Sequence, residues 1–185
     1  MTSNHTCPPR RPGQGLALIG YRGTGKSTVG RIVADRLNRR FLDADLEIEA
    51  RAGRSIRSIF TEWGETVFRD WEEQTLAELT SAYSGAVVAT GGGVVLRETN
   101  RRRIRGFGFV VWLRTDPSEL ARRLESDGRG LAERPPLTRA GTLAEIATIL
   151  EVRIPLYQEL ADLVIETGDK TPAEVAAAIL GCWPG

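Results

Sequence analysis

Residues 20–27 read Gly-Tyr-Arg-Gly-Thr-Gly-Lys-Ser. They match the pattern GxxxxGK[ST], in which glycines let successive backbone N–H groups curl around a phosphate. Lys26 would reach the β- and γ-phosphates of a nucleotide, and Ser27 would hold Mg²⁺. The alternative is a chance match in a glycine-rich loop, which the composition predicts in roughly a few chains per thousand. Lys26 and Lys170 are the only lysines, so the match is informative.

Short apolar runs alternate with helical stretches on both sides of this loop. The expected strands span residues 16–19, 41–42, 86–89, 107–113 and 163–165. The expected helices span residues 26–37, 46–52, 65–82, 117–124, 143–160 and 172–180. In 143–160, spacings of three and four residues predict one buried face made of Leu143, Ile146, Ala147, Leu150, Ile154 and Tyr157. Such alternation predicts βαβ units and a parallel sheet covered on both faces.

The composition limits the classes of protein that remain. A length of 185 residues suits one domain, and a net charge of +1 gives no reason to expect a nucleic-acid or anionic-membrane partner. The only histidine, His5, lies near the N-terminus, which excludes Ser-His-Asp and Cys-His triads from the expected domain. Cys7 and Cys182 form no CxxC pair, which favours a reducing cytoplasm. No apolar run reaches the roughly 18 residues of a membrane span.

Three parts of the chain are expected to differ in order. Residues 1–15 are rich in proline and lack apolar side chains, so we expect a disordered tail rather than a signal or transit peptide. Residues 16–182 are expected to form a single domain. Within it, residues 126–141 contain several glycines and prolines beside arginines, which predicts a mobile surface loop that could act as a lid.

Two carboxylates follow the second expected strand, in Phe-Leu-Asp43-Ala-Asp45. If the strand continued through both, they would point to one face, one toward the water shell of a metal and the other toward an acceptor hydroxyl. The alternative is that they cap the helix that follows. The segment alone does not decide between these readings.

A triple glycine and two arginines suggest a place for the acceptor. Thr90 and Gly91–Gly93 follow a buried strand, where a ligand could lie against bare backbone, although a flexible turn is the alternative. Arg69 and Arg153 stand among apolar neighbours on expected helices. A buried guanidinium there suits a substrate carboxylate, and a structural ion pair is the usual alternative.

These features narrow the class of phosphate-binding protein. A GTPase would carry an NKxD segment, which has no counterpart here, and a large motor ATPase needs more chain. A small P-loop kinase remains, with gluconate or a nucleoside monophosphate as rival acceptors. A nucleotide-dependent regulatory module without catalysis is an alternative of another class.

The chain resembles the shikimate kinase family from about Leu16 to Leu180. The motifs that carry this resemblance are GYRGTGKST, FLDADLEIEARAGRSIRSIF, FRDWE, TGGG, RPPLT and VRIPLYQELADLVIET followed by TPAEV. The resemblance implies a three-layer α/β P-loop kinase fold with five parallel strands in the order 2-3-1-4-5. It also implies ATP-dependent phosphorylation of the 3-hydroxyl of shikimate, in aromatic amino-acid biosynthesis. We expect Mg²⁺ as cofactor, ATP and shikimate as partners, and a cytoplasmic monomer.

The resemblance assigns roles residue by residue. The catalytic residues would be Lys26, Asp45 and Arg134. The ATP-binding residues would be Gly23, Thr24, Gly25, Lys26, Ser27, Thr28, Arg134, Lys170 and Pro172. Shikimate would contact Asp45, Arg69, Gly91, Gly92, Gly93 and Arg153. The metal would be served by Ser27 and Asp43.

The expected lid departs from the family pattern. It looks several residues longer than in compact members and has RPPLT in place of RPLL. Either Arg123 or Arg129 would therefore contact adenine, whereas the Arg-Pro motif at Arg134 is intact.

Overall fold

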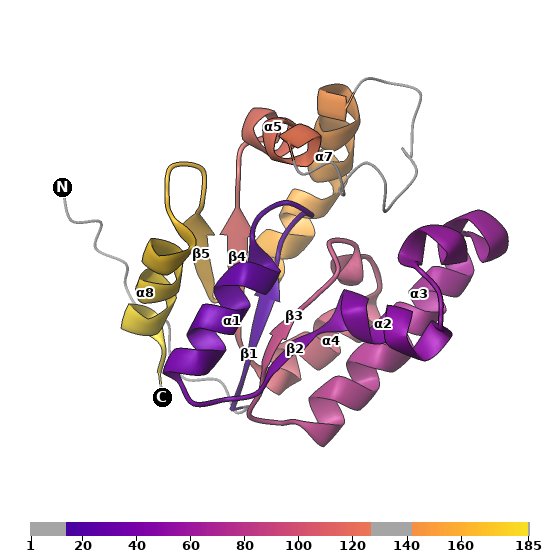
Figure 1. Cartoon of the computed structure of the whole chain (residues 1–185). Helices are drawn as coiled ribbons and strands as arrows, with labels where there is room; N and C mark the ends of the chain where they lie inside the picture. The colour runs from indigo at the N-terminus through magenta and orange to yellow at the C-terminus, as the bar shows by residue number, and fades with distance from the viewer. Residues whose placement is uncertain (1–13, 127–141, 185) are drawn as a thin grey trace.

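Five strands form one parallel sheet at the centre of the molecule (Figure 1). They are β1 (Gly15–Ile19), β2 (Phe41–Asp43), β3 (Val87–Ala89), β4 (Gly108–Arg114) and β5 (Leu163–Glu166). Their spatial order is β2-β3-β1-β4-β5, and every neighbouring pair is parallel. The expected strand order is therefore confirmed. This computed structural model describes residues 14–126 and 142–184; most of the expected tail and nearly all of the expected lid lie outside these residues.

Helices cover both faces of the sheet (Figure 1). They are α1 (Lys26–Arg36), α2 (Ala44–Ala52), α3 (Ile56–Ala82), α4 (Glu98–Phe107), α5 (Pro117–Ser126), α7 (Thr142–Leu160) and α8 (Pro172–Cys182), with a 3₁₀ turn η1 (Val94–Leu96). One face of the sheet packs on α1 and α8, and the other on α3, α4, α5 and α7. None of the helices in the described ranges is long and apolar enough to cross a membrane.

Strand β1 shows why the sheet needs helices on both sides. Successive side chains of a strand point to opposite faces. Leu16 and Leu18 are fully buried in the core formed with α1 and α8, while Ala17 and Ile19 are buried in the core on the other face. A continuous apolar run is what a strand buried on both faces requires.

Two helical segments differ from the sequence-based expectation. Helix α3 begins at Ile56 instead of residue 65, with the Ser55 hydroxyl capping it, and its regular backbone breaks at Gly64 (φ 83°, ψ 172°). Helix α4 was not expected, because its sequence is rich in arginine and only Ile104 and Phe107 bury apolar side chains there. Strand β4 consequently begins at Gly108, one residue later than expected.

The expected apolar face of α7 is only partly buried. Ile146, Leu150 and Tyr157 are buried, but Leu143 and Ile154 are 50% and 37% exposed. Helix α7 packs against both α5 and the sheet. Ile154 lines a hollow between α7 and the first turn of α5, so its side chain is not covered. The expectation of one continuous buried stripe was therefore wrong for these two residues.

Candidate active site

The loop between β1 and α1 has the backbone that phosphate binding requires. Gly20, Gly23 and Gly25 have φ values of 137°, 81° and 89°, which residues other than glycine rarely adopt. A β-carbon on Gly20 would lie 2.4 Å from the carbonyl oxygen of Leu113. The loop opens directly into α1, whose N-terminal N–H groups and dipole favour an anion.

Lys26 lies inside this loop instead of projecting into solvent. Its side chain is buried, and its ammonium donates to the carbonyl oxygens of Gly20 and Tyr21 at 2.8 and 2.7 Å. The Thr24 hydroxyl also turns inward, donating to the Tyr21 carbonyl at 2.8 Å, so only the backbone of Thr24 is available to a phosphate. Thr28 is exposed in the first turn of α1.

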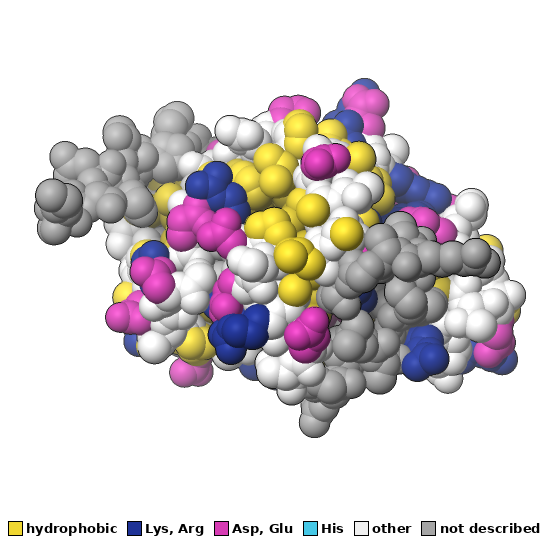
Figure 2. Space-filling view, turned by 90° about the horizontal axis from the view of Figure 1, so that it is seen from above, with side chains coloured by type: hydrophobic (Ala, Val, Ile, Leu, Met, Phe, Trp, Pro, Cys, Tyr) yellow, Lys and Arg dark blue, Asp and Glu magenta, His cyan; other side chains and the backbone are white. Residues whose placement is uncertain are grey.

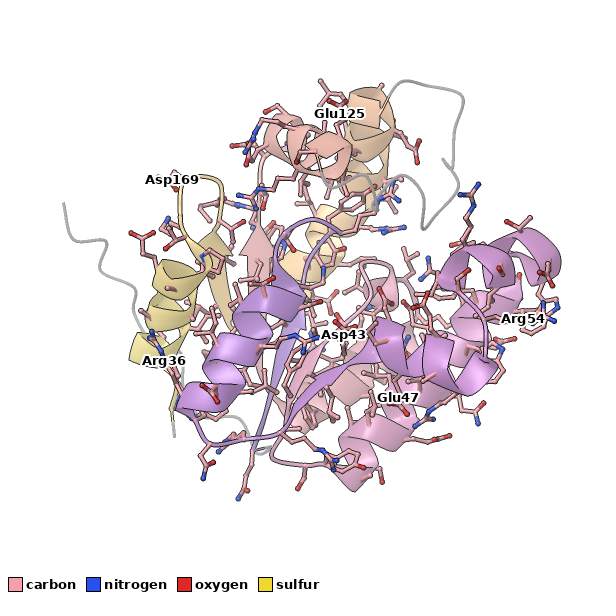
Figure 3. All side chains as sticks on the ribbon, in the orientation of Figure 1. Arg36, Asp43, Glu47, Arg54, Glu125 and Asp169 are labelled. Carbon is pink, nitrogen blue, oxygen red and sulfur yellow. The ribbon has the colours of Figure 1, made fainter. Side chains whose placement is uncertain are left out.

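The end of β2 lies beside the start of α1. The Ser27 hydroxyl donates to Oδ2 of Asp43 at 2.5 Å, and Oδ1 of Asp43 accepts from the backbone N–H groups of Asp45 and Leu46. Asp43, labelled in Figure 3, is thus both the N-cap of α2 and the partner of Ser27. The strand does not continue through Asp45, which lies in the first turn of α2. The condition for placing both carboxylates by strand alternation is therefore not met, because the helix begins at Ala44, and the alternative of a helix cap is confirmed for Asp43.

This pair of oxygen donors fits Mg²⁺. The ion binds hard oxygen ligands and usually keeps several waters, with one or two protein carboxylates and substrate phosphates completing its shell. Ser27 and Asp43 offer a hydroxyl and a carboxylate next to the phosphate-binding loop. Within residues 14–126 and 142–184, no cluster of three or more His, Cys, Asp or Glu side chains could hold a metal by itself. Such a cluster is what an all-protein cage would need, and Mg²⁺ does not require one.

The triple glycine lies against charged side chains from α2 and α3. A β-carbon on Gly91 would lie 2.7 Å from Oδ1 of Asp45 and 2.7 Å from Oε1 of Glu72. A β-carbon on Gly93 would lie 2.2 Å from a guanidinium nitrogen of Arg69. A side chain at either position would displace these groups, and glycine lets the loop approach them closely. The loop is a packed wall of the site and not a free turn.

Arg69 is held by two glutamates on its own helix. It pairs with Glu72 at 2.7 Å and with Glu65 at 2.9 Å, and the side chain of Glu72 is only 1% exposed. Burial by itself lowers the pKa of Arg69, but Glu72 and Glu65 outweigh it, so the net pKa is raised and the charge is secure. The structural ion pair considered from the sequence is present, and it leaves the guanidinium beside Gly93.

Arg153 reaches the same region from α7. Its side chain is buried and lies over the ring of Tyr21, 5.9 Å from the ring centroid. Its guanidinium also acts on the hydroxyl of Tyr157, one helical turn further along α7, and lowers the pKa of that group. Within the described ranges, Arg153 forms no ion pair with a carboxylate, in contrast to Arg69.

One arginine, Arg123, joins the phosphate loop to the segment after β5. Arg123 on α5 donates to the carbonyl oxygens of Thr167 and Gly168 at 2.7 and 3.2 Å. It also lies 3.4 Å from the carbonyl oxygen of Gly23, and Glu119 holds its Nε at 2.7 Å. Arg123 therefore spans the gap between the two loops.

Two further expected nucleotide contacts follow Gly168. Lys170 is exposed and donates to the carbonyl oxygen of Glu166 at 3.1 Å, while Pro172 begins α8 behind the capping residue Thr171. Both lie on the segment that Arg123 contacts. Arg129 and Arg134 lie outside the described residues.

The structure brings the remaining expected residues to one edge of the sheet. This edge is formed by the carboxyl ends of the strands, where ligands bind in folds of this type. Figure 2 shows the molecule from the same side, with hydrophobic side chains near the middle of the visible surface and basic and acidic side chains around them. Sequence reasoning missed Glu72 and Tyr157, although both share a helix face with an expected arginine: Glu72 stands three residues after Arg69, and Tyr157 four after Arg153.

A nucleotide-phosphate loop facing a wall of glycines and buried arginines defines the class of P-loop phosphotransferases that act on a small anionic acceptor. Residues 22–183 match the family model described as shikimate kinase. The chain belongs to the shikimate kinase family.

Individual relatives agree with this assignment. The chain is 44% identical over 165 residues to a shikimate kinase of Pseudomonas putida, covering 89% of this chain and 93% of that one. It is 46% identical over 159 residues to a shikimate kinase of Burkholderia lata, covering 86% and 84%. A solved shikimate kinase of Acinetobacter baumannii, in complex with shikimate, superposes with a TM-score of 0.84 at 38% identity, covering 92% of each chain.

Proposed function

We propose that this chain transfers the γ-phosphoryl group of ATP to the 3-hydroxyl of shikimate, giving ADP and shikimate 3-phosphate. The observation that carries the proposal is the position of the triple glycine between two sets of groups. On one side, a β-carbon on Gly92 would lie 3.3 Å from the backbone nitrogen of Arg22 in the phosphate loop. On the other side lie Asp45 and Arg69. An acceptor resting on the glycines would face both the donor loop and the charged groups.

The donor half of the site supplies positioning and positive charge. Phosphoryl transfer demands little covalent chemistry from the protein, so most of the catalysis is alignment and charge neutralisation. The backbone N–H groups of Gly23–Ser27 would bind the phosphates, and the ammonium of Lys26 would neutralise their charge. Arg134 of the expected lid stays a prediction; its guanidinium would add positive charge beside the same phosphates. Arg123, Lys170 and Pro172 would flank the adenine, because Arg123 already contacts the segment that leads to the other two.

The acceptor half matches a ring that carries one carboxylate and several hydroxyls. Arg69 and Arg153 would bind the carboxylate through charge-assisted hydrogen bonds. Asp45 would accept a hydrogen bond from the 3-hydroxyl and orient it toward the phosphate loop, either with or without taking its proton. Histidine is absent from residues 14–126 and 142–184, so it offers no competing base there.

Mg²⁺ would be held by Ser27 and by Asp43, the latter acting on the metal's water shell. When bound, the ion supplies positive charge to the β- and γ-phosphates. The hydroxyl and the carboxylate are already in contact, so few side chains need to move to receive it.

A coupled assay of ADP release with shikimate, gluconate and AMP as separate acceptors tests the proposal. We expect turnover with shikimate and much less with the other two. Turnover of gluconate or AMP alone would establish a different small-molecule kinase. ATP binding without turnover of any acceptor would favour a regulatory module.

The monomeric state and the cytoplasmic location stay predictions. Size-exclusion chromatography tests the monomeric state.

A further inference from the structure

Tyr157 connects two parts of the proposed acceptor site that are far apart in sequence. Its hydroxyl donates a hydrogen bond to the carbonyl oxygen of Gly92 in the triple glycine. The guanidinium of Arg153, one helical turn earlier on α7, acts on the same hydroxyl and lowers its pKa. A single hydroxyl on α7 is therefore bonded to the wall on which the acceptor would rest and is influenced by an arginine that would bind the acceptor's carboxylate.

The surroundings of Tyr157 fix the hydroxyl in place and in charge state. The side chain is fully buried, and its ring stacks on Trp112 of β4 with centroids 5.5 Å apart and planes at 27°. Burial raises the pKa of Tyr157 to about 12, although the guanidinium of Arg153 acts in the opposite direction. The phenol therefore stays protonated at neutral pH, where its hydroxyl can donate to the carbonyl oxygen of Gly92.

Gly92 is the member of the triple glycine that faces the phosphate loop. A β-carbon there would lie 3.4 Å from the carbonyl oxygen of Gly20, which also accepts from the ammonium of Lys26. Its neighbours Gly91 and Gly93 face Asp45 and Arg69. A shift of the Gly92 carbonyl would therefore change how the acceptor wall sits relative to both the donor loop and the charged groups.

We propose that Tyr157 is a positioning residue for phosphoryl transfer: its hydroxyl holds the carbonyl of Gly92 in place and orients the guanidinium of Arg153 toward the substrate carboxylate. Tyr157 touches no substrate in this role and acts through its two partners. The inference rests on the proposed function, because it concerns the same acceptor.

The test is Tyr157→Phe, which keeps the ring and its stacking on Trp112 but removes the hydroxyl. Losing a buried hydrogen bond of this kind weakens shikimate binding by about fivefold to thirtyfold. We expect the KM for shikimate to rise by that factor while the KM for ATP changes less than about twofold, since Tyr157 contacts no residue expected to bind ATP. Calorimetric titration with shikimate alone should show the same loss.

A matched control separates positioning from general loosening of α7. Ile146 is buried on α7 three turns before Tyr157, and Ile146→Val removes one methyl group from the same core. Ile146→Val should lower the melting temperature and leave the KM for shikimate unchanged. An equal rise of that KM in both variants would overturn the proposal, as would a Tyr157→Phe enzyme that cannot fold or has unaltered shikimate binding.

A double-mutant cycle with Arg153→Ala tests the partner through which Tyr157 acts. If the hydroxyl works partly by orienting Arg153, Tyr157→Phe should raise the KM for shikimate by a smaller factor in the Arg153→Ala background. Equal factors in the two backgrounds would overturn the link to Arg153. A wild-type enzyme that does not turn over shikimate would instead refute the proposed function, so the two failures are distinct.

Discussion

The hydroxyl of Ser27 donates a hydrogen bond of 2.5 Å to the carboxylate of Asp43, which ties the first turn of α1 to the end of β2. The other oxygen of Asp43 accepts from the backbone N–H groups that open α2. One carboxylate thus links the phosphate loop to the helix that carries Asp45. A structural role and a proposed metal role meet in the same side chain, and substitution can separate them.

Asp43→Asn should leave the fold intact and raise the Mg²⁺ requirement. Asparagine caps a helix as well as aspartate does, but it lacks the negative charge that favours the metal shell. Excess Mg²⁺ should restore part of the activity, measured as turnover across a Mg²⁺ titration. Asp43→Ala should show the same metal defect and, in addition, lose about 0.5–2 kcal/mol of stability with the cap. A wild-type Mg²⁺ dependence in both variants would limit Asp43 to capping α2.

Asp45→Asn should fail in a different way. Asp45 is proposed to hold the acceptor hydroxyl, so added metal should not rescue its amide. If Asp45 acts as a general base, kcat should fall by about 10²–10⁴, and lost orientation should raise the KM for shikimate as well. The measurement is kcat and KM for shikimate across the same Mg²⁺ titration. Rescue of Asp45→Asn by Mg²⁺ would reverse the division of labour between the two aspartates.

The sheet and the phosphate loop could be predicted because their sequence signals are local. A strand buried on both faces is a continuous apolar run, and Gly20–Ser27 specifies its own backbone through its glycines. Helix α4 could not be found in the same way, because arginines obscure its short apolar face. Gly64 interrupts the regular backbone between the two helical segments of α3, and the first segment has a local start signal in Ser55 that the sequence analysis did not use.

The candidate site was predicted as a set of residues but not as a set of contacts. Glu72 stands three residues after Arg69 on the same helix face, so the ion pair between them could have been predicted from helical spacing. The bond from Tyr157 to Gly92 was not, because it joins residues 65 positions apart through the packing of α7 on the sheet. Contacts of that kind are set by tertiary structure and leave no local pattern in the sequence.

Gly64→Ala should destabilise the protein. The backbone of Gly64 (φ 83°, ψ 172°) lies in a region essentially reserved for glycine, where another residue costs on the order of 1–3 kcal/mol. A β-carbon there would meet nothing within 4 Å, so the cost is conformational and not steric. Thermal unfolding should show a decrease of about 2–4 °C for each kcal/mol in a domain of this size.

Gly106→Ala is the matched control for Gly64→Ala. Gly106 lies within helix α4, its φ is not positive, and a β-carbon there also meets nothing within 4 Å. Alanine at such a position restricts the unfolded chain and should stabilise the protein by about 0.4–1 kcal/mol. Equal melting temperatures for the two variants would show that the backbone at Gly64 relaxes without strain.

Arg69→Ala and Arg153→Ala should both weaken shikimate binding but differ in stability. Each removes a charge-assisted hydrogen bond worth about 1.5–3 kcal/mol, so the KM for shikimate should rise roughly tenfold to a hundredfold with ATP binding nearly unchanged. Arg69→Ala also removes the guanidinium that pairs at 2.7 Å with the carboxylate of Glu72, whose side chain is 1% exposed. Breaking a buried pair in this way costs about 3–5 kcal/mol.

The double variant Arg69→Ala, Glu72→Gln separates the two effects of Arg69. It removes the buried negative charge, so it should recover much of the melting temperature lost in Arg69→Ala, because a neutral amide is less costly to bury than a carboxylate that has lost its ion pair. It should not recover shikimate binding, because the guanidinium is still missing. Calorimetry with shikimate and with ATP, together with thermal unfolding, measures both effects. Recovery of shikimate affinity in the double variant would mean that Arg69 acts only by holding Glu72, and a loss of ATP affinity with unchanged shikimate affinity would place the acceptor elsewhere.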